Sequence, residues 1–284
     1  SIELALAMKK NRNQETLSKL LDNKTFVMLF YNYSLRTRLS FEIAATELGG
    51  HAIFFTPEMG RFKTNEFHGE ETMDIARVMS SMASGIGIRM AENAVPFAGY
   101  GNSFIRDFAE HSSAPIISMA DDVNHPCQGL ADIMGWIEHF ADKNHSSNNP
   151  TSTIKDKTLL LTWGHGKMAR THSSINESLL LASRFGMNIK VARPPGYDLS
   201  NEIYAKINDY CVQNGSNFNI YDQHDEGFDN ADIVYGRNWC SSIAYQNNKL
   251  QLASEFDNAM KLNDWIVTEE KMNKTNNAAF THCM

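Results

Sequence analysis

The sequence has few of the features that mark several large classes of protein. Its four cysteines (Cys127, Cys211, Cys240 and Cys283) lie far apart and form no CxxC pair, which favours reduced thiols over a disulfide scaffold or a zinc site. No run of about 18 apolar residues occurs, so no membrane-spanning helix is predicted. The apolar stretch at 4–8 is too short to be the core of a signal peptide.

Excess positive charge is also absent. The net charge is -7 and the isoelectric point is near 5.8, which argues against broad binding to nucleic acid. The chain of 284 residues is 42% hydrophobic, enough for one large or two medium domains with ordinary cores. We therefore expect a cytoplasmic protein that binds neither nucleic acid nor membrane.

The common nucleotide and hydrolase motifs are missing as well. The sequence contains no GxGxxG, GxxxxGK[ST], GxSxG or HExxH. The stretch Gly164-His165-Gly166-Lys167 follows an apolar run, but the other glycines of a nucleotide loop are lacking. These absences disfavour a dinucleotide-binding domain, a P-loop, a serine hydrolase and a metalloprotease.

Apolar runs of strand length alternate with helical patterns along almost the whole chain. This rhythm predicts an α/β fold built from parallel sheets flanked by helices. The predicted strands are 25–30, 51–55, 85–88, 114–119, 158–162, 188–192, 218–221 and 232–235. The predicted helices are 40–48, 70–84, 103–111, 129–140, 176–185 and 201–212.

One polar stretch interrupts this rhythm. Residues 141–150 read ADKNHSSNNP, a composition that cannot pack a core. The stretch separates two predicted domains, 1–140 and 151–284, each with its own parallel sheet. The helical pattern before residue 141 is expected to join them.

A cluster of cations and hydroxyls follows the first predicted strand. Residues 31–40 read YNYSLRTRLS and place Ser34, Arg36, Thr37 and Arg38 at the start of a helix. Such a segment can simply be a solvated helix start with Ser34 as its N-cap. A helix N-terminus with unpaired N–H groups and two arginines is also suited to bind an anion.

Two further polar groups follow predicted strands, where ligands of parallel sheets bind. Arg89 ends the strand GIGIRM; a lone arginine there is often a surface ion-pair partner. His125-Pro126-Cys127-Gln128 precedes a helix, and its histidine and glutamine can share one face. Proline in a first helical turn needs no functional reason, but imidazole and carboxamide together suit a neutral carbonyl substrate.

In this order, the segments resemble the aspartate/ornithine carbamoyltransferase family. SLRTR resembles its Ser-x-Arg-Thr-Arg loop, HPCQ its His-Pro-x-Gln motif, and the terminal His282-Cys283-Met284 the start of its His-Cys-Leu-Pro segment. The resemblance implies a carbamoyl phosphate-binding domain over 1–140 and an amino-substrate-binding domain over 151–284. It implies catalysis without metal or cofactor by Thr37, Arg89, His125 and Gln128. The implied carbamoyl phosphate ligands are Ser34, Leu35, Arg36, Thr37, Arg89, His125, Gln128, Cys283 and Met284.

The resemblance also bears on the amine that accepts the carbamoyl group. Ornithine carbamoyltransferases carry Asp-x-Trp where this chain has Arg237-Asn238-Trp239. A cation there would repel the α-ammonium of free ornithine, and Arg-x-Trp is similar to the Lys-x-Trp of enzymes acting on N-acetylornithine or N-succinylornithine. The function implied is carbamoyl transfer to an N-acylated ornithine in arginine biosynthesis. The implied acceptor-site residues are Phe62, Asp121, His165, Asn176, Arg237 and Trp239.

Other interpretations stay open at this point. The chain could act on ornithine or another amine, or be a catalytically silent homologue that binds an anion. By resemblance the active form is a homotrimer in which the loop around Phe62 reaches a neighbouring subunit. Because the sequence stops at Met284, inside a family motif, we expect the closing C-terminal helix of the family to be missing.

Overall fold

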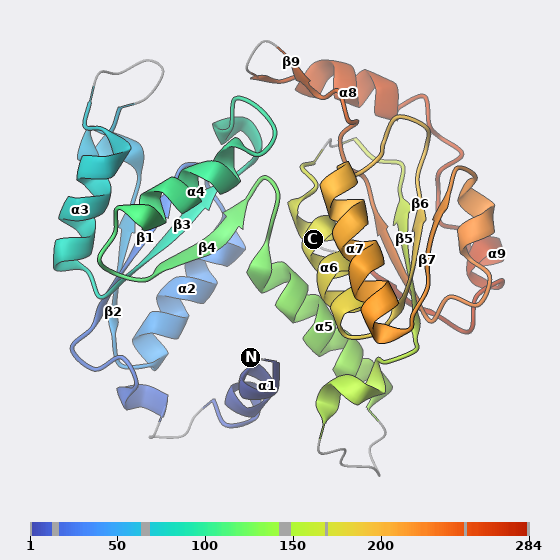
Figure 1. Cartoon of the computed structure of the whole chain (residues 1–284), viewed down its shortest axis with the longest axis horizontal. Helices are drawn as coiled ribbons and strands as arrows, with labels where there is room; N and C mark the ends of the chain where they lie inside the picture. Colours follow the sequence, from blue (N-terminus) through green and yellow to red (C-terminus); the bar gives the residue numbers. More distant parts are fainter. Residues whose placement is uncertain are drawn as a thin grey trace. The chain divides into compact units, whose positions relative to one another are not determined.

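The computed structural model describes residues 2–12, 17–63, 69–141, 149–167, 170–246 and 249–282. The chain forms two compact units: Glu3–His125, and Pro126–Met284, which also includes Ile2. Figure 1 labels the elements of each unit. Among the described residues, no helix is long and apolar enough to cross a membrane.

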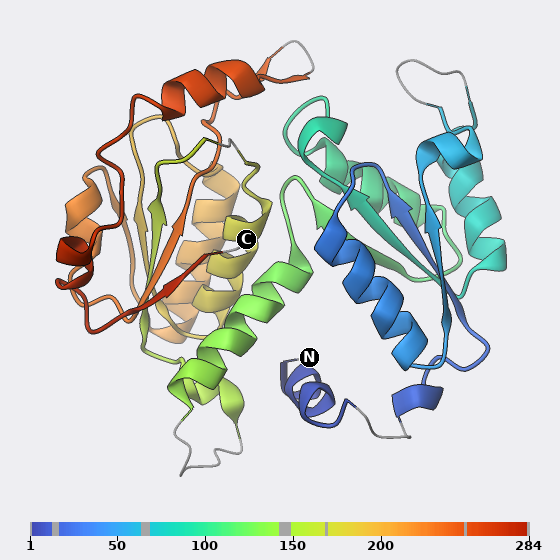
Figure 2. The same ribbon diagram turned by 180° about the vertical axis from the view of Figure 1, so that it is seen from behind.

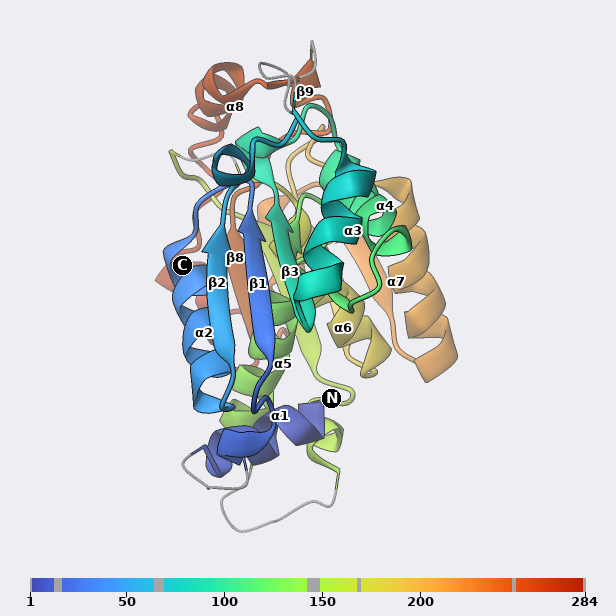
Figure 3. The ribbon, with the colours of Figure 1, turned by 90° about the vertical axis from the view of Figure 1, so that its left-hand side faces the viewer.

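The first unit is built on a parallel sheet with strand order β2-β1-β3-β4. Figure 3 shows β2, β1 and β3 side by side. The strands are β1 (Thr25–Phe30), β2 (His51–Phe55), β3 (Gly85–Met90) and β4 (Ile116–Asp121). The helices are α1 (Ile2–Lys10), α2 (Leu35–Glu47), α3 (Thr72–Met82) and α4 (Tyr100–Glu110), with short 3-10 turns η1 (Leu17–Lys19), η2 (Pro57–Gly60) and η3 (Glu92–Ala94).

Alternation along the strands gives this sheet two buried faces. Successive side chains of a strand point to opposite sides, so Met28 and Phe30 pack in a cluster with Phe41 of α2, while Val27 and Leu29 pack with residues of α3 and α4. Both faces are therefore covered by helices. Because helices cover the two faces, a ligand can reach the sheet at its carboxyl edge, where the strands lead into loops that carry polar groups.

The second unit contains a parallel sheet with strand order β11-β8-β5-β6-β7. Figure 2 shows β11, in red, next to β8. The strands are β5 (Thr158–Trp163), β6 (Asn188–Ala192), β7 (Phe218–Tyr221), β8 (Ile233–Arg237) and β11 (Ala279–Thr281), besides an antiparallel pair, β9 (Tyr245–Gln246) and β10 (Lys249–Leu250). The helices are α5 (Pro126–Phe140), α6 (Ser173–Arg184), α7 (Asn201–Asn214), α8 (Leu252–Ala259) and α9 (Glu269–Met272), with 3-10 turns η4 (Pro150–Thr153) and η5 (His224–Gly227).

The predicted α/β architecture is confirmed, with local differences. Each predicted strand is present, but β4 begins and ends two residues later than predicted. Helix α2 begins at Leu35 rather than at residue 40, because Ser34 caps it. The short elements α1, α8, α9, β9, β10 and β11 were not predicted, since segments of two to nine residues carry little periodic signal.

The unit boundary also differs from the predicted one. The sequence predicts a first domain that ends at residue 140, whereas the compact units divide between His125 and Pro126. Helix α5 packs against α6 and η4 and so lies with the second unit. The polar stretch that guided the prediction marks the end of α5, and a compositional signal of this kind does not tell which unit a helix packs on.

A buried histidine in the second unit sits beside a lysine. His224 is 7% exposed and stacks on Trp265 with ring centroids 4.8 Å apart. Its Nδ1 lies 2.7 Å from Nζ of Lys271, which donates to it and to the backbone carbonyl of Ile266. Burial, reinforced by the charge of Lys271, lowers the pKa of His224 to about 4. The ring is therefore neutral at pH 7, and its Nδ1 accepts a hydrogen bond from Lys271 Nζ.

The stability of the protein should consequently fall in mild acid. Between pH 6.5 and about 4 the unfolded chain binds a proton at His224 and the folded chain does not, so lowering the pH favours unfolding. We expect His224 to contribute a loss of about 1 to 2 kcal/mol by pH 4.5. Urea unfolding of the wild type and of His224→Gln at pH 7 and 4.5, followed by tryptophan fluorescence, measures it. An equal loss in both proteins would contradict the assignment.

Candidate active site

In the first unit, the carboxyl edge of β1 leads directly into the N-terminus of α2. Ser34 is the N-cap: its Oγ accepts a hydrogen bond from the backbone N of Thr37 at 3.3 Å and donates to Thr37 Oγ1 at 3.0 Å. The cap orders the first turn, which carries Leu35, Arg36 and Thr37. This turn combines a positive helix end, two hydroxyls and an arginine, as an anion site requires.

Arg89 lies next to this turn at the end of β3. Its side chain is 8% exposed, and Nη1 donates a hydrogen bond to Thr37 Oγ1 at 3.4 Å. Within the described ranges, no acceptor lies in hydrogen-bond reach of its buried Nε. Burial lowers the pKa of Arg89, Glu92 raises it, and the charge of Arg36 lowers it further. Two cations thus share the site, which favours an anion between them.

Backbone contacts hold Arg89 against the loop that follows β1. Phe30 pairs with Arg89 in the sheet, and the backbone N of Tyr31 donates to the Arg89 carbonyl at 2.9 Å. The Asn32 side chain accepts from the backbone N of Ala91 at 3.0 Å. The register between β3 and β4 shifts by one residue between Ile88 and Arg89, and such bulges re-aim side chains at strand ends. The guanidinium is positioned by the sheet itself.

Asp121 orders the turn that precedes His125. Its Oδ1 accepts from the backbone N of Val123 at 2.9 Å and of Asn124 at 2.7 Å, and its Oδ2 accepts from Ser118 Oγ at 3.0 Å. The residue is 1% exposed. These bonds hold the turn that leads to half-buried His125. A direct contact of Asp121 with the acceptor stays a prediction.

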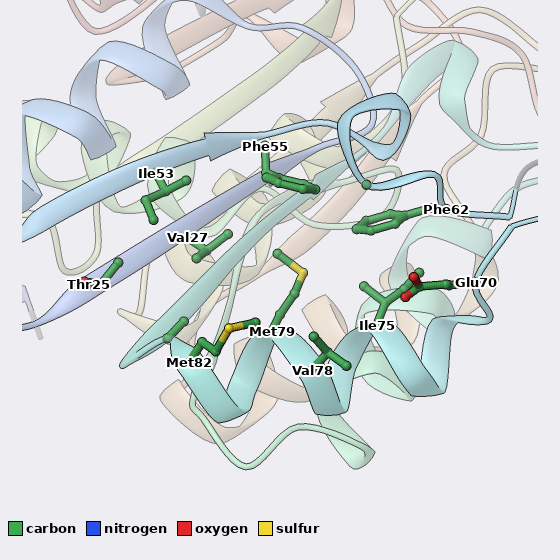
Figure 4. Close-up of a pocket in the computed structure, with 12 residues that line it drawn as sticks. Thr25, Val27, Ile53, Phe55, Phe62, Glu70, Ile75, Val78, Met79 and Met82 are labelled. Carbon is green, nitrogen blue, oxygen red and sulfur yellow. The ribbon is translucent and has the colours of Figure 1, made fainter.

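The structure places the Phe62 ring inside the first unit rather than on its surface. The ring is 5% exposed, stacks on Phe55 with centroids 5.8 Å apart and belongs to the core of this unit. Figure 4 shows it in an apolar cavity with Ile75 and Met79 of α3. A contact of the loop around Phe62 with a neighbouring subunit stays a prediction. The segment that follows, 64–68, lies outside the described residues.

In the second unit, Arg237 ends β8 at the carboxyl edge of its sheet. The side chain is 6% exposed, and its Nε and Nη1 are buried without an acceptor in the part of the chain that the structure describes. Burial raises the pKa of Asp132 on α5 and lowers that of His172 just before α6, and the positive charge of Arg237 lowers both. The guanidinium is therefore close to both side chains and keeps donors for a ligand.

The other predicted acceptor residues take two kinds of position. Trp239 is 1% exposed, and its Nε1 donates to the Tyr197 carbonyl at 2.8 Å, so it is part of the core. Asn176 is buried in the first turn of α6. The backbone N of His165 donates to the Trp265 carbonyl at 2.7 Å, and its buried Nδ1 has no acceptor or donor among the described residues.

The end of the chain approaches the same edge of the second sheet. Strand β11 pairs in parallel with β8, so that Thr281 lies opposite Tyr235 and His282 follows at the level of the site. Cys283 and Met284, both predicted carbamoyl phosphate ligands, lie outside the described residues. Within the described ranges, no group of three or more His, Cys, Asp or Glu side chains is arranged to hold a metal ion.

Comparison with known proteins matches most of the chain to the two domains of one family. Residues 1–138 match the carbamoyl-P binding domain of aspartate/ornithine carbamoyltransferase, and residues 164–284 match its Asp/Orn binding domain. The chain belongs to the aspartate/ornithine carbamoyltransferase family. The predicted family is thereby confirmed, and Ser34, Thr37 and Arg89 lie within the match to the carbamoyl-P binding domain.

Relatives within the carbamoyltransferase family differ in their acceptor. The chain is 31% identical over 99% of its length to the N-acetylornithine carbamoyltransferase of Xylella fastidiosa (strain Temecula1), covering 81% of that protein. It is also 31% identical to the ornithine carbamoyltransferase of Hydrogenovibrio crunogenus, over 99% of this chain and 78% of that one. A structure of acetylornithine transcarbamylase complexed with acetylcitrulline superposes with a TM-score of 0.85 at 27% identity, covering 100% of this chain and 82% of that one.

The structure adds two carboxylates of this carbamoyltransferase that the sequence analysis did not single out. Asp132 lies one helical turn after Gln128 and accepts its hydrogen bond at 2.9 Å; their spacing of four on one helix face is a signal that could have found it. Glu255, 3% exposed, accepts from the backbone N and the Oγ of Ser241 at 2.6 and 2.7 Å. No sequence pattern links residues 241 and 255, because only the fold brings α8 to this loop.

Replacing Arg89 should lower the catalytic rate without lowering the stability of the fold. Because its charge is buried with few partners, Arg89→Met should leave the thermal unfolding temperature equal or higher. Arg89 is a predicted catalytic residue, and losing a donor to a developing oxyanion typically lowers kcat by about 100- to 1,000-fold, which is the loss expected here. Arg106→Met, an exposed arginine on α4, is the matched control and should keep wild-type rates. A near-normal kcat in Arg89→Met would contradict the role of Arg89.

Proposed function

We propose that this protein transfers the carbamoyl group of carbamoyl phosphate to the side-chain amine of an N-acylated ornithine, in arginine biosynthesis in the cytoplasm. The observation that carries the proposal is Arg237. It presents buried donors without an acceptor in the described part of the chain, at the carboxyl edge of the acceptor domain. A buried guanidinium with unpaired donors is suited to bind a carboxylate.

The first unit supplies most of the groups that the reaction needs. The amine nitrogen attacks the carbamoyl carbon, and the C–O bond to phosphate breaks with its electrons leaving on phosphate. The departing phosphate takes up the proton that the amine loses. The α2 N-terminus with Ser34 and Arg36 would hold the phosphate. Arg89, Thr37 and His125 would stabilise the negative charge on the carbonyl oxygen. Positioning and charge account for this step without a covalent enzyme intermediate.

A further contact is proposed for the NH2 end of the carbamoyl group. Gln128, in the first turn of α5, would accept a hydrogen bond from the carbamoyl NH2 through its side-chain oxygen. This contact would distinguish the NH2 end of the group from its carbonyl oxygen. Together with the oxyanion donors it would fix the orientation of the carbon that the amine attacks.

Sequence identity does not distinguish ornithine from N-acetylornithine as the acceptor, but the charge of Arg237 favours the acylated form. The two relatives named above are equally identical to this chain and act on different amines by name. Free ornithine carries an α-ammonium that Arg237 would repel, whereas acylation removes that charge and leaves the carboxylate to pair with it. The N-acetylornithine name of the Xylella relative supports this choice.

Product formation with three acceptors tests the proposal. The protein is supplied with carbamoyl phosphate and either ornithine, N-acetylornithine or N-succinylornithine, and the carbamoylated product is quantified. Turnover of an acylated substrate is expected. Turnover of ornithine alone would overturn the acylated acceptor, and turnover of none would overturn the proposed acceptor class.

The acceptor preference should depend on Arg237. Removing one charge-assisted contact to a carboxylate is expected to raise KM for the acylated acceptor by about 10- to 100-fold in Arg237→Gln. The affinity for carbamoyl phosphate should change much less, since Arg237 is assigned to the acceptor. Arg184→Gln, an exposed arginine at the end of α6, is the control. Unchanged acceptor KM in Arg237→Gln would refute the assignment.

We also propose that the protein self-associates as a homotrimer through the first unit. An apolar stripe on α2 supports this: Leu35, Leu39 and Ile43, each four residues apart on one face, are 73%, 48% and 44% exposed. Exposed stripes of this kind mark contact surfaces. The partner is a second copy of this chain, as the family resemblance implies.

A charge placed in the stripe should break the assembly. Leu39→Glu puts a carboxylate into the proposed apolar contact. In sedimentation velocity this variant should therefore form smaller species than the wild-type protein. Val212→Glu, on an exposed position of α7 in the second unit, is the matched control and should sediment as the wild type. Identical sedimentation of Leu39→Glu and wild type would exclude the stripe as the interface.

A further inference from the structure

A carboxylate in the second unit holds one end of the Gln128 side chain. Asp132 lies four residues after Gln128 on α5, and Gln128 Nε2 donates a hydrogen bond to Asp132 Oδ1 at 2.9 Å. The other oxygen, Oδ2, is 2.5 Å from Ser178 Oγ on α6. Burial raises the pKa of Asp132, while these hydrogen bonds and the charge of Arg237 lower it. The carboxylate thus has a hydrogen-bond partner on each oxygen.

This contact decides which way the carboxamide of Gln128 faces. A carboxamide has a donating nitrogen and an accepting oxygen, and rotation by 180° about its last bond exchanges them. An ionised carboxylate only accepts hydrogen bonds, so the nitrogen end must lie against Asp132. The oxygen Oε1 is then held on the side turned away from Asp132.

We propose that Asp132 is a positioning residue that orients Gln128 so that Oε1 accepts a hydrogen bond from the carbamoyl NH2. The inference rests on the proposed function, in which Gln128 contacts that NH2. With the carboxamide reversed, two donors would face each other and the contact would be lost. Asp132 therefore helps to select a carbamoyl group over an acyl group of the same shape.

Acetyl phosphate provides a direct probe of this selection. It has a methyl group where carbamoyl phosphate has NH2 and is otherwise similar in shape and charge. The ratio of the two dissociation constants, measured by calorimetry in the cold without acceptor, isolates the NH2 contact from phosphate binding. A residue with a merely structural role would weaken both ligands alike and leave the ratio unchanged.

Two substitutions of Asp132 should behave differently. Asp132→Leu, similar in size, removes the anchor and should lower the preference for carbamoyl phosphate about 10-fold, the equivalent of one hydrogen bond. Asp132→Asn should keep the preference within about twofold, because the side-chain oxygen that it retains can still accept from Gln128 Nε2. The new amide nitrogen would face Ser178. Since Ser178 Oγ is also 2.9 Å from the Ser174 carbonyl, it can donate there and accept from that nitrogen.

Three further variants serve as references for the change in the preference for carbamoyl phosphate. Gln128→Leu removes the contact altogether and should show the largest loss of preference. Ser178→Ala removes the second partner of Asp132 without touching Gln128 and should keep the wild-type ratio. Asp132→Ala is a second variant without the anchor, for use if Asp132→Leu does not fold as judged by circular dichroism.

The outcomes separate this inference from the function on which it rests. A wild-type protein that binds both phosphates equally would overturn the Gln128 contact and the inference with it. A wild-type preference that persists in Asp132→Leu and Asp132→Ala would overturn the role of Asp132 alone. Equal weakening of both ligands in those variants would do the same, since it indicates a structural role.

Discussion

The candidate sites depend on two buried arginines. Arg89 ends β3 and Arg237 ends β8, and each is less than 10% exposed with a buried nitrogen that has no acceptor within the described residues. A charge removed from water costs free energy unless an opposite charge approaches it. The two parallel sheets place the guanidinium groups at their carboxyl edges, where an anion can approach and offset that cost.

The groups around these arginines are fixed by side-chain oxygens that accept hydrogen bonds from the backbone. Ser34 caps α2, Asp121 closes the turn before His125, and Glu255 holds the loop after Arg237 through Ser241. Each uses a side-chain oxygen to satisfy backbone N–H groups, which is how loops at sheet edges are made rigid. A carbamoyl transfer that depends on position and charge needs such rigidity, because small displacements weaken oriented hydrogen bonds.

Much of the fold could be predicted, because parallel strands and amphipathic helices leave periodic patterns. The longer strands of both sheets were found within a few residues, and the motifs around Ser34, Arg89 and Gln128 fell where strands end. Failures came where local signal is short or ambiguous. Strand β11 has three residues, and α5 reads the same whichever unit it packs on. The burial of Phe62 was not predicted either: its ring lines an apolar cavity beside α3.

The sequence by itself determined the family, the order of the motifs and the cation that stands at the acceptor position, because these depend on residue types and spacing along the chain. Only the tertiary structure decided which buried side chains, such as Arg89 and Arg237, have N–H groups without an acceptor among the described residues. Burial and hydrogen bonding depend on residues brought together from distant segments, as with Thr37 and Arg89, or Ser178 and Asp132. Such pairings follow from packing, which no local pattern encodes.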